Sequence, residues 1–196
     1  MEANLIFYVL NTGISVVVAL VCLRFLLQLA QVNFYNPISQ GVNRFTTPLT
    51  AVFSGLPTVG PFNIGILVAA IVIQAVGAGL CLLLLGGIPG LAQLVIWSVL
   101  SVFGVMINLV FYALLGMIIL SWLAPNASHP GAELLYELSE PFLAPFRKII
   151  PDLGGLDLSP ILLFIAINLI EAVVIRGPAH AMGLSQTVAQ FFVGIG

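Results

Sequence analysis

Four long apolar runs are the feature that most constrains what this chain can fold into. They occupy residues 5–30, 64–85, 91–124 and 160–175. Only 6% of the residues are charged and 61% are hydrophobic, whereas a soluble domain carries about 25% charged residues. Because about 20 apolar residues carry a helix across a bilayer, the runs predict four membrane-spanning helices. The expected fold class is therefore an all-α membrane protein.

The third and fourth runs depart from an ideal crossing. At 1.5 Å per residue, residues 91–124 would reach roughly 50 Å against a hydrocarbon core of about 30 Å. We place the span at about 95–124 and expect the run to begin at the interface, to tilt, or to kink near Gly104. The fourth run is short, and Ser159 followed by Pro160 predicts a helix start at which the serine is the cap.

Two stretches of the chain match each other at a constant offset of 93 residues. Residues 24–53 align without a gap on residues 117–146, and two prolines eleven residues apart recur in register. The identical pairs are Leu27/Leu120, Asn33/Asn126, Pro37/Pro130, Pro48/Pro141, Ala51/Ala144 and Phe53/Phe146. The match predicts a first repeat at 1–90, a second at 91–176, and a tail at 177–196 in which Ser185 could cap an interfacial helix.

Four spans place both termini on one side of the membrane and both long connections, residues 31–61 and 125–159, on the other. Two spans in each repeat make the repeats parallel rather than inverted. The other side carries only Arg176, whereas the long connections hold Arg44, Arg147 and Lys148. The positive-inside rule therefore predicts cytoplasmic long connections and termini on the outer side.

Each long connection is expected to contain an amphipathic helix that lies along the membrane surface or packs over the bundle. In the first, Asn36 can cap a helix that begins at Pro37 and whose apolar face is Ile38, Val42 and Phe45. In the second, the apolar face is Leu134, Leu135, Leu138 and Phe142, and Glu133, Glu137 and Glu140 point elsewhere. Since proline cannot continue the helical hydrogen-bond ladder, we expect Pro48 and Pro141 to end these helices, with an extended proline-rich segment after each.

The second connection also carries a compact motif between Glu140 and Pro160. Its members are Pro141, Pro145, Phe146, Arg147, Pro151, Gly155, Asp157, Ser159 and Pro160, with Leu120-Ser121-Trp122 ahead of it. This motif resembles the signature of the YggT family of small integral membrane proteins, also called the YlmG family, and the resemblance extends over essentially the whole chain. The first copy lacks the Phe-Arg pair and the Gly-Leu-Asp-Leu-Ser-Pro run. The arginine usual in the first span is Arg24 in copy one, but Met117 stands there in copy two.

The resemblance implies a protein of the bacterial inner membrane with a role that is known only through phenotypes. Family members are connected with osmotic stress tolerance and potassium uptake, and plastid relatives with assembly of a membrane cytochrome complex and with nucleoid distribution. Two functions stay open. The first is an accessory or assembly protein that organises another membrane complex; the second is a small oligomeric ion conduit or potassium-uptake component. The scarcity of intramembrane polar groups favours the first.

Other classes of function find little support in the sequence. A net charge of −2 gives no basic surface for nucleic acid. Cys22 and Cys81 lie inside apolar runs and are interpreted as core residues, and His129 and His180 have no partners at ligand spacing. We therefore expect no enzyme activity, cofactor or metal, and we expect the partners to be the lipid bilayer, other membrane proteins or further copies of the chain.

Five polar residues inside the spans are candidate sites: Arg24, Gln74, Asn108, Asn168 and Glu171. Glu171 is either an ion or proton site that shares a polar patch with Asn168, or a hydrated carboxylate near Arg176. Arg24 is expected to reach toward the long connections, with pairing to Glu171 as the alternative. Gln74 and Asn108 are expected to hydrogen-bond across helices that small residues bring together.

The charged motif residues have two interpretations as well. Arg147, Lys148, Asp152 and Asp157 could dock a partner protein or lipid headgroups. Alternatively, Arg147 and Asp157 form a local salt bridge that folds the connection over the bundle.

Overall fold

The computed structural model describes residues 2–84, 86–87, 90–123, 129–149 and 157–178, with side chains from residue 5 onward. Its elements are α1 (Glu2–Leu29), α2 (Pro37–Thr50), η1 (Ala51–Phe53), β1 (Thr58–Val59), β2 (Phe62–Asn63), α3 (Ile64–Leu84), α4 (Leu91–Leu123), α5 (Pro130–Arg147), α6 (Ser159–Ile170) and η2 (Glu171–Arg176). The expected all-α membrane fold is confirmed. Among the described residues, four helical segments are long and apolar enough to span a membrane: Leu5–Leu29, Ile64–Leu84, Leu91–Leu123 and Ser159–Arg176.

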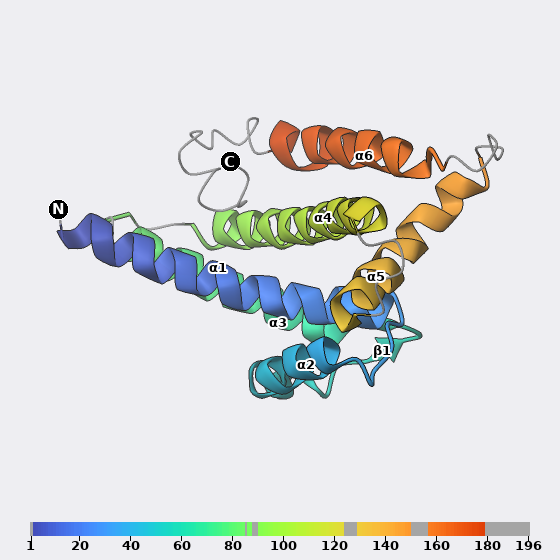
Figure 1. Ribbon diagram of the computed structural model, residues 1–196. Coiled ribbons are helices and arrows are strands. Elements are labelled where there is room, and N and C mark those ends of the chain that lie inside the picture. The colour runs from blue at the N-terminus through green and yellow to red at the C-terminus, as the bar shows by residue number, and fades with distance from the viewer. Residues whose placement is uncertain (1, 85, 88–89, 124–128, 150–156, 179–196) are drawn as a thin grey trace.

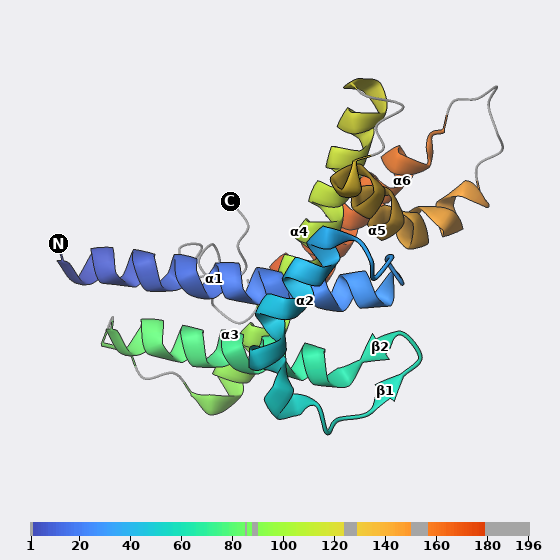
Figure 2. The ribbon, with the colours of Figure 1, turned by 60° about the horizontal axis from the view of Figure 1, so that its bottom comes forward.

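The bundle is built on the close packing of α1 against α3, which run side by side (Figures 1 and 2). Gly77 makes this approach possible, because a Cβ there would overlap the side chain of Ile14. Helix α4 packs on both α1 and α3 and crosses them obliquely, and α6 packs on α4 (Figure 2). The α1–α3–α4 contact encloses the fully buried side chains of the core, among them Val18, Val21, Cys22, Ala69, Val102 and Leu114.

Helix α4 forms a single helix of 33 residues, and it runs without a break through Gly104, which is buried in the bundle. The oblique crossing of α4 over α1 and α3 accommodates its length within the bundle without a break in the helix (Figure 2). A residue as small as Gly104 allows neighbouring helices to approach closely at this position.

Both long connections lie at one end of the bundle, where α2 and α5 contact each other (Figure 1). This end, formed by α2, α5 and the segments that join them to the spans, is called the connection end below. The start of α1 and the end of η2 lie at the opposite end (Figure 1).

The expectation that proline ends both connecting helices is wrong. Helix α2 continues through Pro48 to Thr50, and α5 continues through Pro141 and Pro145 to Arg147. A proline keeps a helical φ and removes only one backbone hydrogen bond, at the price of a local distortion, so packing on both sides can hold the helix together. The expected start of α2 is correct, because Asn36 accepts a hydrogen bond from the Ile38 amide ahead of Pro37. His129 plays the same part before Pro130 at the start of α5, which was not predicted from the sequence.

The two connecting helices differ in the faces they bury. In α5 the expected apolar face is buried or half-buried against the core, and Glu133 and Glu140 are exposed. In α2, Ile38 and Phe45 of the expected apolar face are exposed and only Val42 of that set is buried, so most of this face does not pack on the bundle. The residues that α2 buries with Val42 are hydroxyl side chains: Ser39, Thr46 and Thr50.

A small antiparallel hairpin, β1–β2, follows α2 and was not expected from the sequence. Gly60 adopts a positive φ of 59° in its turn. The ring of Phe62 packs edge-on against Phe25 of α1, with ring centroids 5.0 Å apart. Asn63 then caps α3 through a 3.2 Å hydrogen bond from the Ile66 amide to its Oδ1. The hairpin thereby anchors the first connection between α1 and α3.

Candidate functional site

The principal polar site inside the bundle is the contact between Arg24 of α1 and the hydroxyl face of α2. Arg24 Nη1 donates to Thr46 Oγ1 at 3.2 Å and to Thr47 Oγ1 and Thr50 Oγ1 at 3.1 Å. The Asn43 carbonyl oxygen lies 3.4 Å from the same nitrogen. Arg24 therefore reaches toward the connection end and is held there by neutral oxygen acceptors.

The local sequence of α2 explains why these hydroxyls face the bundle. Positions 46, 47 and 50 fall within one helical turn, so their side chains gather on one side. Each threonine also donates its hydroxyl hydrogen to a backbone oxygen one turn earlier, Thr46 to Val42, Thr47 to Asn43 and Thr50 to Thr46. Because those hydrogens are committed to the backbone, the oxygen lone pairs remain available to the guanidinium.

A pocket of about 320 Å³ adjoins Arg24 at the end of α1. Its lining consists of Arg24, Leu27, Gln28, Gln31, Val32, Phe34, Ser39, Val42 and Asn43. Ser39 is buried, and its Oγ makes no hydrogen bond within the described part of the chain. The sequence reasoning found Arg24 but missed both the threonine cluster and this pocket. The Thr-Thr-Pro-Leu-Thr spacing at 46–50 was the available signal.

The second repeat builds a different polar site on the equivalent helix. Met117 stands where copy one has Arg24, so the equivalent position of α4 provides no guanidinium. Instead Arg147, at the end of α5, binds both carboxylate oxygens of Glu140 at 2.6 and 2.7 Å. Its Nε also donates to Asp157 Oδ2 at 2.9 Å. Arg147 thus links α5 to the segment that starts α6.

Asp157 has a second role, because its Oδ1 accepts a hydrogen bond from the Ser159 amide at 2.9 Å. Asp157, rather than Ser159, therefore supplies the side-chain acceptor at the start of α6, which corrects the expected serine cap. Burial is the largest single influence on Asp157 and opposes its ionisation, but the hydrogen bonds from Ser159 and Arg147 and the charge of Arg147 together outweigh it and lower the pKa of this carboxyl. Burial likewise opposes the charge on Arg147, and its bonds to Asp157 and Glu140 outweigh this and raise its pKa.

The other motif residues differ in their exposure. Pro141 and Pro145 are exposed on α5, Phe146 packs against the core, and Ser159 is buried with Pro160 beside it. Lys148 is exposed and forms no ion pair with any described residue. Pro151, Asp152 and Gly155 lie outside the described residues, as does the predicted helix after Ser185. Of the two interpretations of the charged motif residues, the structure contains the local salt bridge between Arg147 and Asp157.

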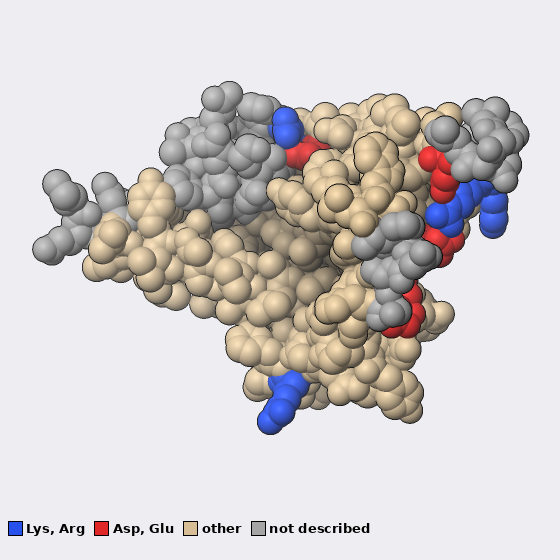
Figure 3. All heavy atoms as spheres, viewed as in Figure 1, with Lys and Arg blue, Asp and Glu red and all other residues tan. Residues whose placement is uncertain are grey.

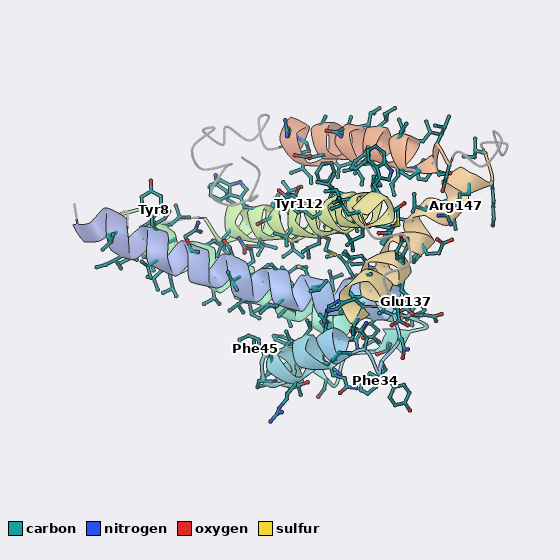
Figure 4. All side chains as sticks on the ribbon, viewed as in Figure 1. Tyr8, Phe34, Phe45, Tyr112, Glu137 and Arg147 are labelled. Atoms are coloured by element: carbon teal, nitrogen blue, oxygen red, sulfur yellow. The ribbon has the colours of Figure 1, made fainter. Side chains whose placement is uncertain are left out.

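Two hydrogen bonds join the repeats directly at the connection end. The Asn36 side-chain amide donates to the Pro130 carbonyl oxygen at 2.7 Å, and the Asn33 amide donates to Glu137 Oε2 at 2.8 Å. Asn36 is buried and also caps α2, so one side chain fixes the starts of both connecting helices. Figure 4 shows Glu137 on α5 turned toward the α2 connection.

The remaining intramembrane candidates do not form one site with Arg24. Glu171 is buried and accepts two hydrogen bonds from Arg176, at 2.8 and 3.2 Å, at the far end of the bundle. The π-helical geometry of η2 places these residues, five apart, on one face. The structure therefore does not bring Arg24 and Glu171 together.

The three amide candidates are separate from that pair. Asn168 is exposed and donates to its own helix at the Phe164 carbonyl, so it shares no patch with Glu171. Gln74 is buried and Asn108 half-buried, but neither hydrogen-bonds across helices within the described part of the chain. A search of the described residues found no group of His, Cys, Asp and Glu that could hold a metal ion.

These observations define a multi-pass α-helical membrane protein made of two tandem repeats, each a span, a surface helix and a second span. The family model for CCB3/YggT matches the chain twice, at residues 3–84 and 96–177. The chain belongs to the CCB3/YggT family, and the two matches lie at the same 93-residue offset as the internal repeat.

Bacterial relatives match most of the chain, and a plant relative matches a shorter part of it. An uncharacterized protein of Pseudomonas aeruginosa is 44% identical over 187 residues, covering 94% of this chain and 95% of its own length. The uncharacterized protein YggT of Escherichia coli is 30% identical over 171 residues, with coverages of 86% and 88%. The chloroplastic YlmG homolog protein 2 of Arabidopsis thaliana is 47% identical over 51 residues, 26% of this chain and 20% of its own. No solved structure matches the chain.

Proposed function

We propose that the protein is an accessory or assembly protein that supports another membrane complex through its connection end. The observation that carries this proposal is the distribution of charge. Acidic and basic side chains gather along α5 and at the start of α6 (Figure 3): Glu133, Glu137, Glu140, Arg147, Lys148 and Asp157. A mixed-charge surface next to apolar spans suits docking to the polar part of a membrane partner.

The state of the two ionisable groups inside the spans supports this proposal over an ion conduit. A conduit needs polar groups that face a shared path and exchange partners with an ion. Arg24 is held by three threonines at the connection end, and Glu171 is paired with Arg176 near the other. Between them, Gln74 and Asn108 make no polar connection within the described residues. The proposed role therefore requires no transport through the protomer.

The proposed location is a bacterial inner membrane with the connection end in the cytoplasm. This orientation is favoured because the connection end carries more basic residues than the opposite end. Support of a complex involved in osmotic adjustment or potassium uptake would connect this role with the phenotypes that the family resemblance implies. The partner is then a membrane protein with a complementary charged surface beside its spans.

Purification from native membranes under mild detergent tests the proposal. Arg147→Ala breaks the link between α5 and the start of α6, whereas Arg44→Ala removes an equal charge from an exposed position on α2. We expect a defined complex to co-purify with the wild type and with Arg44→Ala, and to be lost with Arg147→Ala. Equal recovery of the complex with all three proteins would show that α5 and its salt bridge do not take part in binding the partner.

The conduit alternative has its own test in liposomes that contain the purified protein. We expect potassium flux no greater than that of empty liposomes. Flux that disappears in Glu171→Gln would replace the accessory role with transport.

A further inference from the structure

The pocket beside Arg24 combines features of a ligand site that the accessory role does not use. Its volume of about 320 Å³ lies within the range of small-molecule sites, and its lining mixes apolar with polar side chains. The apolar part consists of Leu27, Val32, Phe34 and Val42, and the polar part of Arg24, Gln28, Gln31, Ser39 and Asn43. Phe34, which belongs to this lining, is exposed.

The pocket carries an uncompensated positive charge. Arg24 is half-buried and is hydrogen-bonded only to hydroxyl and carbonyl oxygens, and no ion pair joins it to a described carboxylate. All four of its hydrogen bonds use Nη1, so Nε and Nη2 make no bond to the described residues. A guanidinium held on one side, with free donors on the other, is suited to bind an anion with more than one oxygen.

Ser39 points to a ligand independently of the charge. Its side chain is more than nine-tenths buried in the pocket wall, and its Oγ has no hydrogen-bond partner in the described part of the chain. An unsatisfied buried hydroxyl destabilises a protein, so such a group is expected to have a partner in the functional state. Because the Oγ atom is closed off from the pocket, the Ser39 side chain must rotate about its Cα–Cβ bond to reach an oxygen acceptor there.

Gln31 adds a third observation. The backbone bonds Gln31 N to Gln28 O and Val32 N to Leu27 O close α1 with a Schellman motif, which places Gln31 in the left-handed region at φ 54°. Glycine is the ordinary residue there, and Gly86 takes the equivalent place after α3, at φ 77°. Keeping glutamine at a strained position retains an amide side chain in the pocket lining.

We propose that this pocket binds the phosphate group of an anionic phospholipid. Arg24 would contribute the charge, and Ser39 and Gln31 would donate hydrogen bonds to phosphate oxygens. Arg24 lies five residues before the end of α1, about 8 Å along the helix, at the depth where headgroups meet the hydrocarbon. The apolar part of the lining then accommodates the start of the acyl chains, which a free phosphate ion would leave empty.

The experiment measures the thermal unfolding midpoint of the full-length protein in nanodiscs, together with the lipids it retains in native mass spectrometry. The probes are phosphatidylglycerol, phosphatidylcholine and inorganic phosphate. Three variants are compared with the wild type: Ser39→Ala, Gln31→Gly and the control Arg44→Gln. The control removes a positive charge outside the pocket, on the same helix as Ser39. Arg24→Gln is not used on its own as a test, because it also removes the hydrogen bonds that attach α1 to α2.

Phosphatidylglycerol is expected to raise the midpoint of the wild type and of Arg44→Gln, and to remain bound more than phosphatidylcholine. Without that lipid, Ser39→Ala and Gln31→Gly should unfold no earlier than the wild type, because one loses an unsatisfied hydroxyl and the other a strained backbone. Their affinity for phosphatidylglycerol should nevertheless fall roughly tenfold. Equal binding of the two lipids, full binding by both pocket variants, or an equal shift with inorganic phosphate would each overturn the proposal.

Discussion

Thr47 and Glu140 occupy the same position in the two repeats, and each accepts a hydrogen bond from an arginine that the other repeat lacks. Thr47 Oγ1 lies 3.1 Å from Nη1 of Arg24, whose counterpart is Met117. Glu140 Oε2 lies 2.6 Å from Nη1 of Arg147, whose counterpart is Ser54. In the first repeat, therefore, an arginine of the preceding span binds the connecting helix α2. In the second repeat the arginine belongs to the connecting helix α5 itself, at its C-terminal end.

Replacing Arg24 with the methionine of the second repeat should weaken the attachment of α2. The three threonine hydroxyls would keep their bonds to the α2 backbone, so only the bonds to the guanidinium are lost. We expect Arg24→Met to lower the free energy of unfolding by about 2–3 kcal/mol. Denaturant unfolding in detergent measures this, and Arg44→Met, at an exposed site, should change it by less than about 0.5 kcal/mol.

A side chain at position 77 should separate α1 from α3. Gly77→Ala would place its Cβ against Ile14, and overpacking of this kind costs about 1–3 kcal/mol. Gly13→Ala, a matched substitution on α1 with open space around it, should be neutral or stabilising. In thermal unfolding, Ile14→Ala combined with Gly77→Ala should lose less than the two single losses together. Strict additivity would show that the two helices do not meet at these residues.

The link between Asp157 and Arg147 should make stability depend on pH under acid conditions. The bonds to Asp157 hold its pKa below the ordinary value, so their contribution is present above about pH 4 and is lost as the pH falls through the folded pKa. Both side chains are nearly half exposed, which limits the effect to about 0.2–1 kcal/mol. Unfolding midpoints measured from pH 6 to pH 3 should fall more in the wild type than in Asp157→Asn. Parallel curves would contradict the salt bridge.

The pair at the far end of the bundle should respond unequally to loss of its two partners. Arg176→Gln leaves the buried Glu171 carboxylate unpaired, whereas Glu171→Gln leaves an arginine that is largely exposed. We therefore expect the first change to destabilise the protein by about 1–3 kcal/mol and the second by less than about 1 kcal/mol. Chemical unfolding of both single variants and the double variant compares them. The opposite order would mean that Glu171 has another partner.

The frame of the protein could be predicted from the sequence because hydrophobic length and helix-start chemistry are local signals. The four apolar runs predicted the spans, and Asn36 ahead of Pro37 predicted the start of α2 that the structure contains. The ends of α2 and α5 could not be predicted from proline alone. Packing on α2 and α5 outweighs the single hydrogen bond that each proline removes.

The candidate sites were harder to predict because they depend on which faces meet. Hydrophobicity identified Ile38, Val42 and Phe45 as one apolar face of α2, but it could not show which face meets the bundle, because that rule assumes a water-facing outer side. Beside a membrane the outer side can be apolar, and the inner side instead holds the threonines that satisfy Arg24. A basic residue inside a span was therefore the signal to look for a hydroxyl-rich helix nearby.

Crosslinking at Lys148 in native membranes tests the accessory role most directly. Lys148 is the only lysine in the sequence, it is exposed, and it follows Arg147 at the end of α5. An amine-reactive reagent should join Lys148 to one defined membrane partner, and the adduct should be absent in Lys148→Arg and strongly reduced in Arg147→Ala. An accessible Lys148 that yields no partner adduct, or an adduct that Arg147→Ala leaves unchanged, would contradict a docking role for the connection end.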